Sequence, residues 1–285
     1  MRATAVSEPC PVPVSDADVE AFAADGAVCL RDVIDRYWLE LLAEGVERNL
    51  ASPGPRGAYA DGEARRFFQD SDNWDRIPEL EEFVRRSPAA AMAGVLMGAT
   101  KVNFLHDHVL VKEPGAAKAT IWHQDQPYSP VDGSQFLAVW IPLDPVGRDA
   151  TLEFVLGSHR WGHWYRPQRF ADGALRADDD DRWAVLPDID GHRGDHRVAG
   201  WALEPGDCLA FHGLMLHSAP GNVSAVDRRR AVTTRWTGDD ARFRRRSGEM
   251  SPPPPATGPA DGGILDCRAF PVVARRAEDG VRWVW

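Results

Sequence analysis

The stretch Thr120-Ile-Trp-His-Gln-Asp-Gln-Pro-Tyr128 joins a strand-like tripeptide to two side chains that can bind a metal ion. His123 and Asp125 are two residues apart, and such residues project to the same side of an extended chain. A histidine followed two places on by an acid is weak evidence alone, because roughly one such triplet is expected by chance at this composition. The pair therefore predicts a metal site only together with a third ligand.

His217 is the candidate for that third ligand. It follows a predicted strand, 207–211, which Pro205-Gly206 introduces. Enough chain separates it from Asp125 for several strands to lie between them. Two imidazoles and one carboxylate occupy one face of an octahedral iron ion and leave adjacent positions open for a cosubstrate and dioxygen. The sequence therefore predicts that His123, Asp125 and His217 converge on one ion.

Arg228-Arg-Arg230 comes shortly after His217 and leads into an apolar strand, 231–236. A buried strand that begins with arginine suggests a bound anion, since a guanidinium holds a carboxylate through two hydrogen bonds. At least two of the three arginines are expected to be solvated surface residues.

β-Branched and alternating residues dominate from residue 102 onward and predict many short strands, as in a sandwich or barrel. Helical periodicity prevails earlier in the chain and begins at a capping box formed by Ser15 and Asp18. The predicted fold class is mainly β with flanking helices. The predicted helices follow Ser15, cover 35–50 and cover 78–97; the predicted strands are 27–30, 102–111, 136–141, 151–155, 198–203, 207–211, 231–236 and 269–273.

One domain is expected to cover residues 1–285, because β-sandwiches and barrels often reach roughly 200–250 residues as one unit. It divides into an α-rich part (15–100), a β core (101–243) with an insertion at 166–197, and a C-terminal part (251–285). In the last part, a stiff proline-rich segment at 252–255 is expected to carry the tail back onto the body. The acidic run at 177–182 predicts a solvated loop.

Composition excludes several partners. The net charge of −10 opposes binding to nucleic acid or to an anionic membrane, and no apolar run near the N-terminus resembles a signal peptide or a membrane span. The four cysteines lie far apart without a CxxC pair, which favours neither a zinc knuckle nor a disulfide framework. A cytoplasmic protein that acts on a small molecule is expected.

The chain resembles the phytanoyl-CoA dioxygenase family within the iron(II)/2-oxoglutarate-dependent oxygenases. The resemblance extends from about residue 15 to residue 243 and depends on the order of its motifs rather than on any one of them. These motifs are Leu110-Val-Lys-Glu-Pro-Gly115, Trp122-His-Gln-Asp-Gln-Pro-Tyr-Ser-Pro-Val-Asp-Gly133, Trp140-Ile-Pro-Leu-Asp144, Gly157-Ser-His-Arg-Trp-Gly162, Glu204-Pro-Gly-Asp207 and His217-Ser-Ala-Pro-Gly-Asn222.

The resemblance implies a double-stranded β-helix (a jelly roll, cupin-like) that uses iron(II), 2-oxoglutarate and dioxygen. It implies iron ligands at the three residues already named. It also implies that an arginine before the Arg-Ala-Val strand binds the 2-oxoglutarate carboxylate. Matching the strand selects Arg229, whereas counting from His217 without a gap selects Arg228. Lys112 occupies the place of a family lysine that can also contact the cosubstrate.

The implied reaction is hydroxylation or another oxidation of an unactivated C–H bond of a small metabolite or natural product, with release of succinate and CO2. Because Asp125 is retained, no halide site opens, and halogenation is disfavoured. Two departures from the family pattern predict altered cosubstrate contacts: the segment 149–154 lacks an asparagine-glycine pair, and Ala219 replaces a common serine.

Several segments and side chains are candidates for the pocket walls. The N-terminal helices and the insertion at 166–197 are candidate covers. For each candidate aromatic side chain, packing in the core is at least as good an explanation. The candidate lining residues are Phe67, Phe68, Trp74, Tyr128, Gln135, Trp140 and Tyr165.

Two alternatives stay open. His106, His108, Glu113 and His217 match a cupin-like metal set that needs no 2-oxoglutarate. A binding protein that keeps the fold without catalysis is the other alternative.

Overall fold

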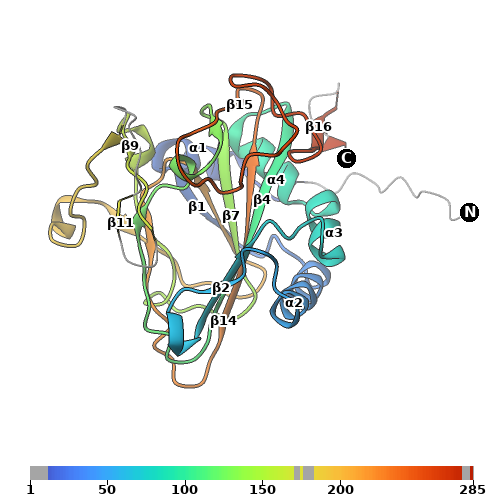
Figure 1. The fold of residues 1–285 in the computed structure, drawn as a ribbon. Coiled ribbons are helices and arrows are strands. Elements are labelled where there is room, and N and C mark those ends of the chain that lie inside the picture. The colour runs from blue at the N-terminus through green and yellow to red at the C-terminus, as the bar shows by residue number, and fades with distance from the viewer. Residues whose placement is uncertain (1–11, 170–173, 176–182, 278–282, 285) are drawn as a thin grey trace, which may run out of the picture.

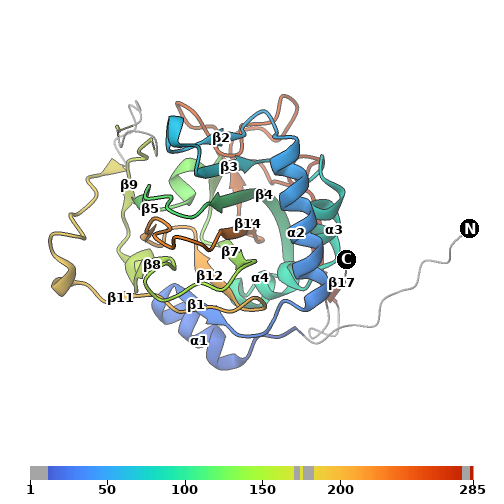
Figure 2. The same ribbon diagram turned by 90° about the horizontal axis from the view of Figure 1, so that it is seen from below.

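The computed structural model describes residues 12–169, 174, 175, 183–277, 283 and 284. The acidic run at 177–182 lies outside the described residues. The fold is a jelly roll, or double-stranded β-helix, in which a large and a small β-sheet enclose a pocket. Figure 1 shows the long strands, and Figure 2 shows the small sheet, the large sheet and the helices as successive layers. The predicted fold class is confirmed.

The large sheet has the strand order β1-β12-β7-β14-β4-β16-β17, and β3 also pairs with β4 and with β2. The small sheet has the order β11-β8-β13-β5, and two further pairs, β10-β9 and β15-β6, lie outside both. The strands are β1 (Ala27–Leu30), β2 (Ala58–Tyr59), β3 (Phe67–Ser71), β4 (Lys101–Lys112), β5 (Thr120–His123), β6 (Val131–Asp132), β7 (Phe136–Pro142), β8 (Glu153–Val155), β9 (Trp164–Tyr165), β10 (Trp183–Ala184), β11 (Val198–Ala199), β12 (Cys208–His212), β13 (His217–Ala219), β14 (Arg229–Thr237), β15 (Arg242–Phe243), β16 (Val272–Arg276) and β17 (Trp283–Val284).

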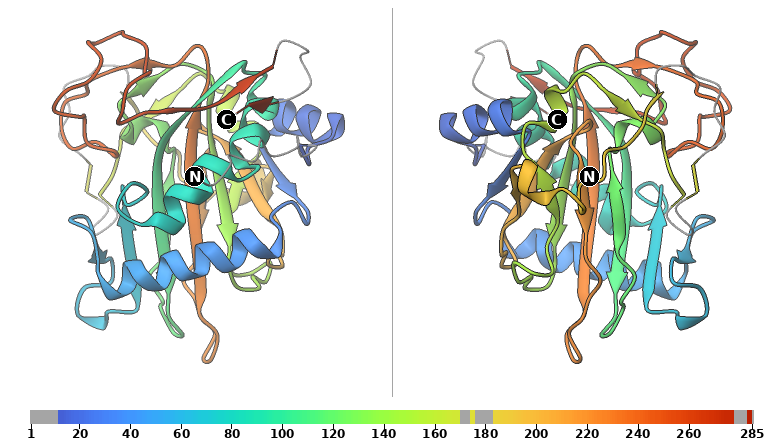
Figure 3. Two further views of the ribbon diagram at one scale, coloured as in Figure 1. Left: turned by 90° about the vertical axis from the view of Figure 1, so that its right-hand side faces the viewer. Right: turned by 90° about the vertical axis from the view of Figure 1, so that its left-hand side faces the viewer.

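Four helices of the described chain are α1 (Asp16–Asp25), α2 (Arg36–Ala51), α3 (Pro78–Arg86) and α4 (Ala89–Met97). The capping box at Ser15 is present, and Gly26 ends α1 with φ 80°. Helices α2 to α4 cross the outer face of the large sheet (Figure 3). None of the described helices is long and apolar enough to cross a membrane.

The helical stretch predicted at 78–97 is confirmed in its bounds but is divided into two helices, α3 and α4. Helix α3 ends at Ser87, whose backbone is extended with φ −74° and ψ 164°. The following Pro88 explains the break, since a proline disfavours helical backbone at the residue before it.

One face of β4 and β14 packs in the core, and the other face lines the pocket. Val109 and Val111 on β4 and Val232 on β14 point outward into a core that the helices cover. The alternate residues of both strands face inward and line the pocket. These central strands therefore place a row of side chains between the two sheets.

Some predicted strands differ from the structure. The strand predicted at 198–203 is shorter, because only β11 forms there, and the strand predicted at 269–273 is shifted to β16. Strand β3 was not predicted at all. The tail returns to the body as expected, since β16 pairs with β4.

The described part of the insertion at 166–197 packs outside the pocket. Ile189 packs in a cluster with Trp122, and the Nε1 of Trp122 donates a hydrogen bond of 3.0 Å to Asp190. No described residue of the insertion lines the large pocket. The prediction that the insertion covers the pocket is therefore wrong for its described residues.

Candidate metal centre and pocket

Two strands of the small sheet bring the predicted metal ligands together. His123 ends β5 and pairs in register with His217 at the start of β13, while Asp125 follows β5 by two residues. In the described part of the chain, these three residues form the one group whose ligand atoms lie within 4.8 Å of one another. Asp125 Oδ1 lies 3.5 Å from His123 Nε2 and 3.8 Å from His217 Nε2.

The hydrogen bonds of both imidazoles fit metal binding. His123 Nδ1 lies 2.8 Å from the carbonyl oxygen of Ile121, and His217 Nδ1 lies 3.0 Å from that of Met215. A carbonyl only accepts, so each Nδ1 carries the proton and each Nε2 keeps its lone pair. Burial lowers the pKa of His217 to about 3, and the neighbouring His123 acts in the same direction.

Asp125 is buried and ionised. Burial alone would raise the pKa of its carboxyl. The positive charge of Arg235 and a hydrogen bond from His123 oppose this effect and hold the pKa well below its ordinary value. Two neutral imidazole nitrogens and one carboxylate oxygen therefore face one point, which is the donor set of a non-haem iron(II) site.

Arg235 on β14 is a site residue that the sequence analysis missed. Its Nε donates a hydrogen bond of 2.8 Å to Asp125 Oδ2, so that Oδ1 is the oxygen that faces the two histidines. The guanidinium is almost fully buried. A signal was available, because Arg229, Ala231, Thr233 and Arg235 alternate along the strand and all line the pocket.

The pocket beside this group has a volume of about 820 Å³. At one end, Lys112 and Arg229 lie opposite each other on paired strands and are both buried. Lys112 Nζ donates to the carbonyl oxygens of Lys118 (2.9 Å) and Pro220 (2.8 Å). Arg229 donates to the carbonyl oxygens of Ala150 and Pro220.

Neither basic side chain of this end has an acidic partner among the described residues, since both donate their hydrogen bonds to carbonyl oxygens. Burial lowers the pKa of Lys112 to about 6, with the charge of Arg229 contributing, and burial lowers that of Arg229 to about 10. Arg229 is a cation at pH 7, and a bound anion would favour the charged form of Lys112, so the two side chains together form a site for an anion.

Arg228 lies elsewhere. Its guanidinium forms ion pairs with Glu47 (3.1 Å) and Glu113 (2.9 Å) near the surface. Of the two candidate arginines, Arg229 lines the pocket and Arg228 does not.

The cupin-like metal set requires the carboxylate of Glu113 as a ligand. That carboxylate accepts a hydrogen bond from Arg228 instead. His106 and His108 do line the pocket, but with Glu113 and His217 they form no metal-capable group among the described residues.

The candidate lining residues divide into three groups. Phe67, Tyr128 and Trp140 line the pocket. Phe68 and Trp74 belong to the core under the helices, and Tyr165 packs with Trp122. Gln135 donates to the carbonyl oxygen of Met97 and does not line the pocket.

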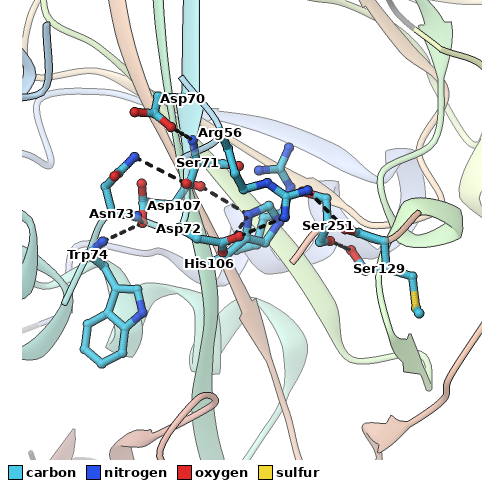
Figure 4. Close-up of polar contacts among 12 residues, drawn as sticks. Arg56, Asp70, Ser71, Asp72, Asn73, Trp74, His106, Asp107, Ser129 and Ser251 are labelled. Atoms are coloured by element: carbon cyan, nitrogen blue, oxygen red, sulfur yellow. Dashed lines mark hydrogen bonds and ion pairs between the residues drawn. The ribbon is translucent and has the colours of Figure 1, made fainter. Parts of the chain in front are cut away.

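Two segments that sequence reasoning did not assign to the pocket complete its wall. Residues between 55 and 60 line it from the N-terminal part, and residues between 245 and 254, including Pro253 and Pro254, line it from the C-terminal part. Arg56 connects these segments by donating 3.1 Å to the carbonyl oxygen of Met250 (Figure 4).

Solved structures with this architecture include three related to the present chain at low identity. The non-haem α-ketoglutarate-dependent carbocyclase SnoK from nogalamycin biosynthesis is 21% identical, with a TM-score of 0.73, 94% of this chain covered and 100% of that chain. The epimerase SnoN from the same biosynthesis is 22% identical, with a TM-score of 0.69 and coverages of 90% and 96%. EctD from S. alaskensis, solved with 2-oxoglutarate and 5-hydroxyectoine, is 17% identical, with a TM-score of 0.66 and coverages of 88% and 87%. At these identities the likeness shows a common fold.

No curated protein matches the sequence. A family comparison matches residues 22–231, which is most of the chain and includes every predicted metal ligand and both candidate arginines. The chain therefore belongs to the phytanoyl-CoA dioxygenase (PhyH) family.

Proposed function

We propose that this protein is an iron(II)- and 2-oxoglutarate-dependent oxygenase whose iron is held by His123, Asp125 and His217. The observation that carries the proposal is the convergence of two Nε2 atoms and one carboxylate oxygen beside a pocket with two buried basic side chains that have no acidic partner. Membership of the PhyH family supports it. So do similar folds in a carbocyclase described as α-ketoglutarate-dependent and in EctD, which was solved with 2-oxoglutarate.

The cationic end of the pocket suits one carboxylate of 2-oxoglutarate. Arg229 offers a planar guanidinium to it, and Lys112 lies directly across the strand pair. The pair has no acid of its own, so a bound carboxylate supplies the missing negative charge. When bound, iron and 2-oxoglutarate supply an oxidation by dioxygen that releases succinate and CO2.

The protein's own residues orient and enclose this chemistry. Arg235 keeps Asp125 ionised and leaves one of its oxygens for the metal. Phe67, Tyr128 and Trp140 provide apolar walls that exclude water from the reacting centre. We assign the protein to hydroxylation or a related oxidation of an unactivated C–H bond in a small metabolite or natural product.

The test measures succinate formed from 2-oxoglutarate under air, together with the iron content of two variants. We expect Asp125→Ala to lose both iron and succinate formation, and His106→Ala to retain iron. Loss of iron with His106→Ala alone would instead support the cupin-like metal set. Iron retention without any succinate formation by the unaltered protein would support a binding protein on the same fold.

A further inference from the structure

A row of uncharged polar side chains lines the pocket away from the cationic end. It consists of Gln69 and Ser71 on β3 and His106 and His108 on β4, and is called the neutral row below. Ser71 and His108 lie opposite each other in the strand register. Figure 4 shows Ser71 and His106 of this row. Within the described chain, the side chains of Gln69, Ser71 and His108 form no hydrogen bond, so they are free to bind a ligand.

Each histidine of the neutral row has one ring nitrogen that can accept a hydrogen bond. Burial lowers the pKa of His108 to about 3 and that of His106 well below its ordinary value, so both imidazoles are neutral at pH 7. His106 Nδ1 lies 3.1 Å from the carbonyl oxygen of Asp107 and therefore carries the proton. Its Nε2 is left as an acceptor, which needs a donor from the ligand. A hydroxyl group of the ligand can donate a hydrogen bond to this nitrogen, whereas a carboxylate or a phosphate dianion has no hydrogen to donate.

Most of the charges around the neutral row are paired, including Arg246 with Asp132. The carboxylate of Asp70 accepts hydrogen bonds from Asn49 and from the backbone of Gly54. Arg56 lies 3.3 Å from Asp72 and 3.6 Å from Glu249, and Arg235 is paired with Asp125. Arg245 at the rim is exposed, so solvent and salt screen its charge. This end thus differs from the Lys112–Arg229 end, where two cations have no acid between them. A charged substrate group would be buried here without a partner, which is unfavourable.

We propose that the neutral row binds the substrate of the oxygenase, and that this substrate is an uncharged, hydroxyl-bearing molecule. The inference rests on the proposed function, because it assigns the substrate to the part of the pocket that 2-oxoglutarate leaves open. The row adjoins the metal group, since Arg235 contacts Asp125 and lies opposite His106 in the β4–β14 register. A hydroxyl held by the row would lie next to the carbon that is oxidised.

Two fluorescent probes that differ in one group test the charge requirement, and variants of the neutral row test its hydrogen bonds to the hydroxyl groups. These are 4-methylumbelliferyl β-D-glucoside, which is neutral, and the matching β-D-glucuronide, which carries a carboxylate. Their binding is measured by equilibrium dialysis without oxygen, on full-length protein loaded with cobalt(II) and 2-oxoglutarate. The variants are Ser71→Ala and His108→Leu in the neutral row, with Lys112→Met at the cationic end as the matched control.

We expect the glucoside to bind at least about 10-fold more tightly than the glucuronide, because a buried carboxylate would lose its hydration and find no unpaired cation in the neutral row. Each neutral-row variant is expected to weaken glucoside binding about 3- to 10-fold, as for the loss of one hydrogen bond. Lys112→Met is expected to weaken 2-oxoglutarate binding and leave the glucoside unaffected when 2-oxoglutarate is saturating.

Equal or tighter binding of the glucuronide would overturn the proposal, as would failure of both probes to bind or glucoside binding that the neutral-row variants do not alter. Failure of the proposed function is separate and shows as the inability of the unaltered protein to bind cobalt(II) and 2-oxoglutarate. Thermal unfolding of each variant shows whether it is folded. Retained 2-oxoglutarate affinity in Ser71→Ala and His108→Leu shows that the rest of the pocket is intact.

Discussion

The two ends of the β4–β14 strand pair bury cations in different ways. At one end, Lys112 and Arg229 face each other without an acid, and burial depresses the pKa of both. Six residues further along β14, Arg235 is just as buried but is bound to Asp125. Burial alone therefore does not identify a ligand site. The uncompensated cations mark where an anion binds, and the compensated one marks a residue that positions a neighbour.

Replacing Arg229 gives the largest expected change. Arg229→Met removes the guanidinium that faces the proposed carboxylate, and we expect affinity for 2-oxoglutarate to fall about 100-fold. Arg228→Met is the matched control, because Arg228 is bound to Glu47 and Glu113 near the surface. Calorimetric titration of 2-oxoglutarate into cobalt(II)-loaded protein distinguishes them. An equal loss of 2-oxoglutarate affinity in both variants would show that Arg229 has no specific role in binding the carboxylate.

Arg235→Met tests the compensated end. The variant leaves Asp125 buried without its cation and frees Oδ2, so we expect metal affinity to fall about 10- to 100-fold, as for other partners of metal ligands. Arg230→Met is the control, since Arg230 lies on the same strand but is bound to Asp144 outside the pocket. Cobalt(II) titration followed by visible absorption reports both affinity and coordination. An unchanged spectrum and affinity would mean that Arg235 does not position the ligand.

The pH dependence of 2-oxoglutarate binding sharpens the comparison further. The pKa of Lys112 is lowered to about 6, so its amine is largely neutral at pH 7 in the free protein. An anion favours the ammonium form, and binding above pH 6 should therefore take up a proton. Affinity should then fall by up to about tenfold per pH unit as pH rises from 7 toward 9.

Calorimetry in two buffers of different ionisation enthalpy measures this proton uptake directly. Lys112→Met should abolish the uptake as well as weaken binding. Binding that releases protons, or takes up none in the unaltered protein, would show that Lys112 does not become charged in the complex.

Local patterns in the sequence predicted much of the architecture. Strand β7 and most of β4, β12 and β14 follow from alternating or continuous apolar residues, and the start of α1 follows from the capping box at Ser15. Strand β3 was missed because its second half, Gln69-Asp70-Ser71, is polar. Its polar residues are explained by the pocket that they line, which local periodicity does not reveal.

The site was predictable to the extent that its residues carry a motif. The three metal-capable residues followed from their spacing and strand context, and the resemblance to the family indicated Lys112 and left Arg228 and Arg229 as alternatives. The alternation of Arg235 with Arg229 along β14 indicates only that the two face the same side. Arg235 itself was not predicted, because its partner Asp125 lies 110 residues away. The wall formed by residues 245–254 was missed for the same reason.

The smallest expected effect concerns the aromatic ring beside Lys112. Lys112 Nζ lies 4.4 Å from the centre of the Phe67 ring, a geometry that stabilises an ammonium group but not a neutral amine. Phe67→Leu should therefore weaken 2-oxoglutarate binding about 2- to 5-fold if Lys112 is charged in the complex. Phe68→Leu alters the opposite face of β3, which packs in the core, and should lower the unfolding temperature without changing 2-oxoglutarate affinity. Weaker binding with Phe68→Leu alone would mean that the core, rather than the ring, controls the cationic end.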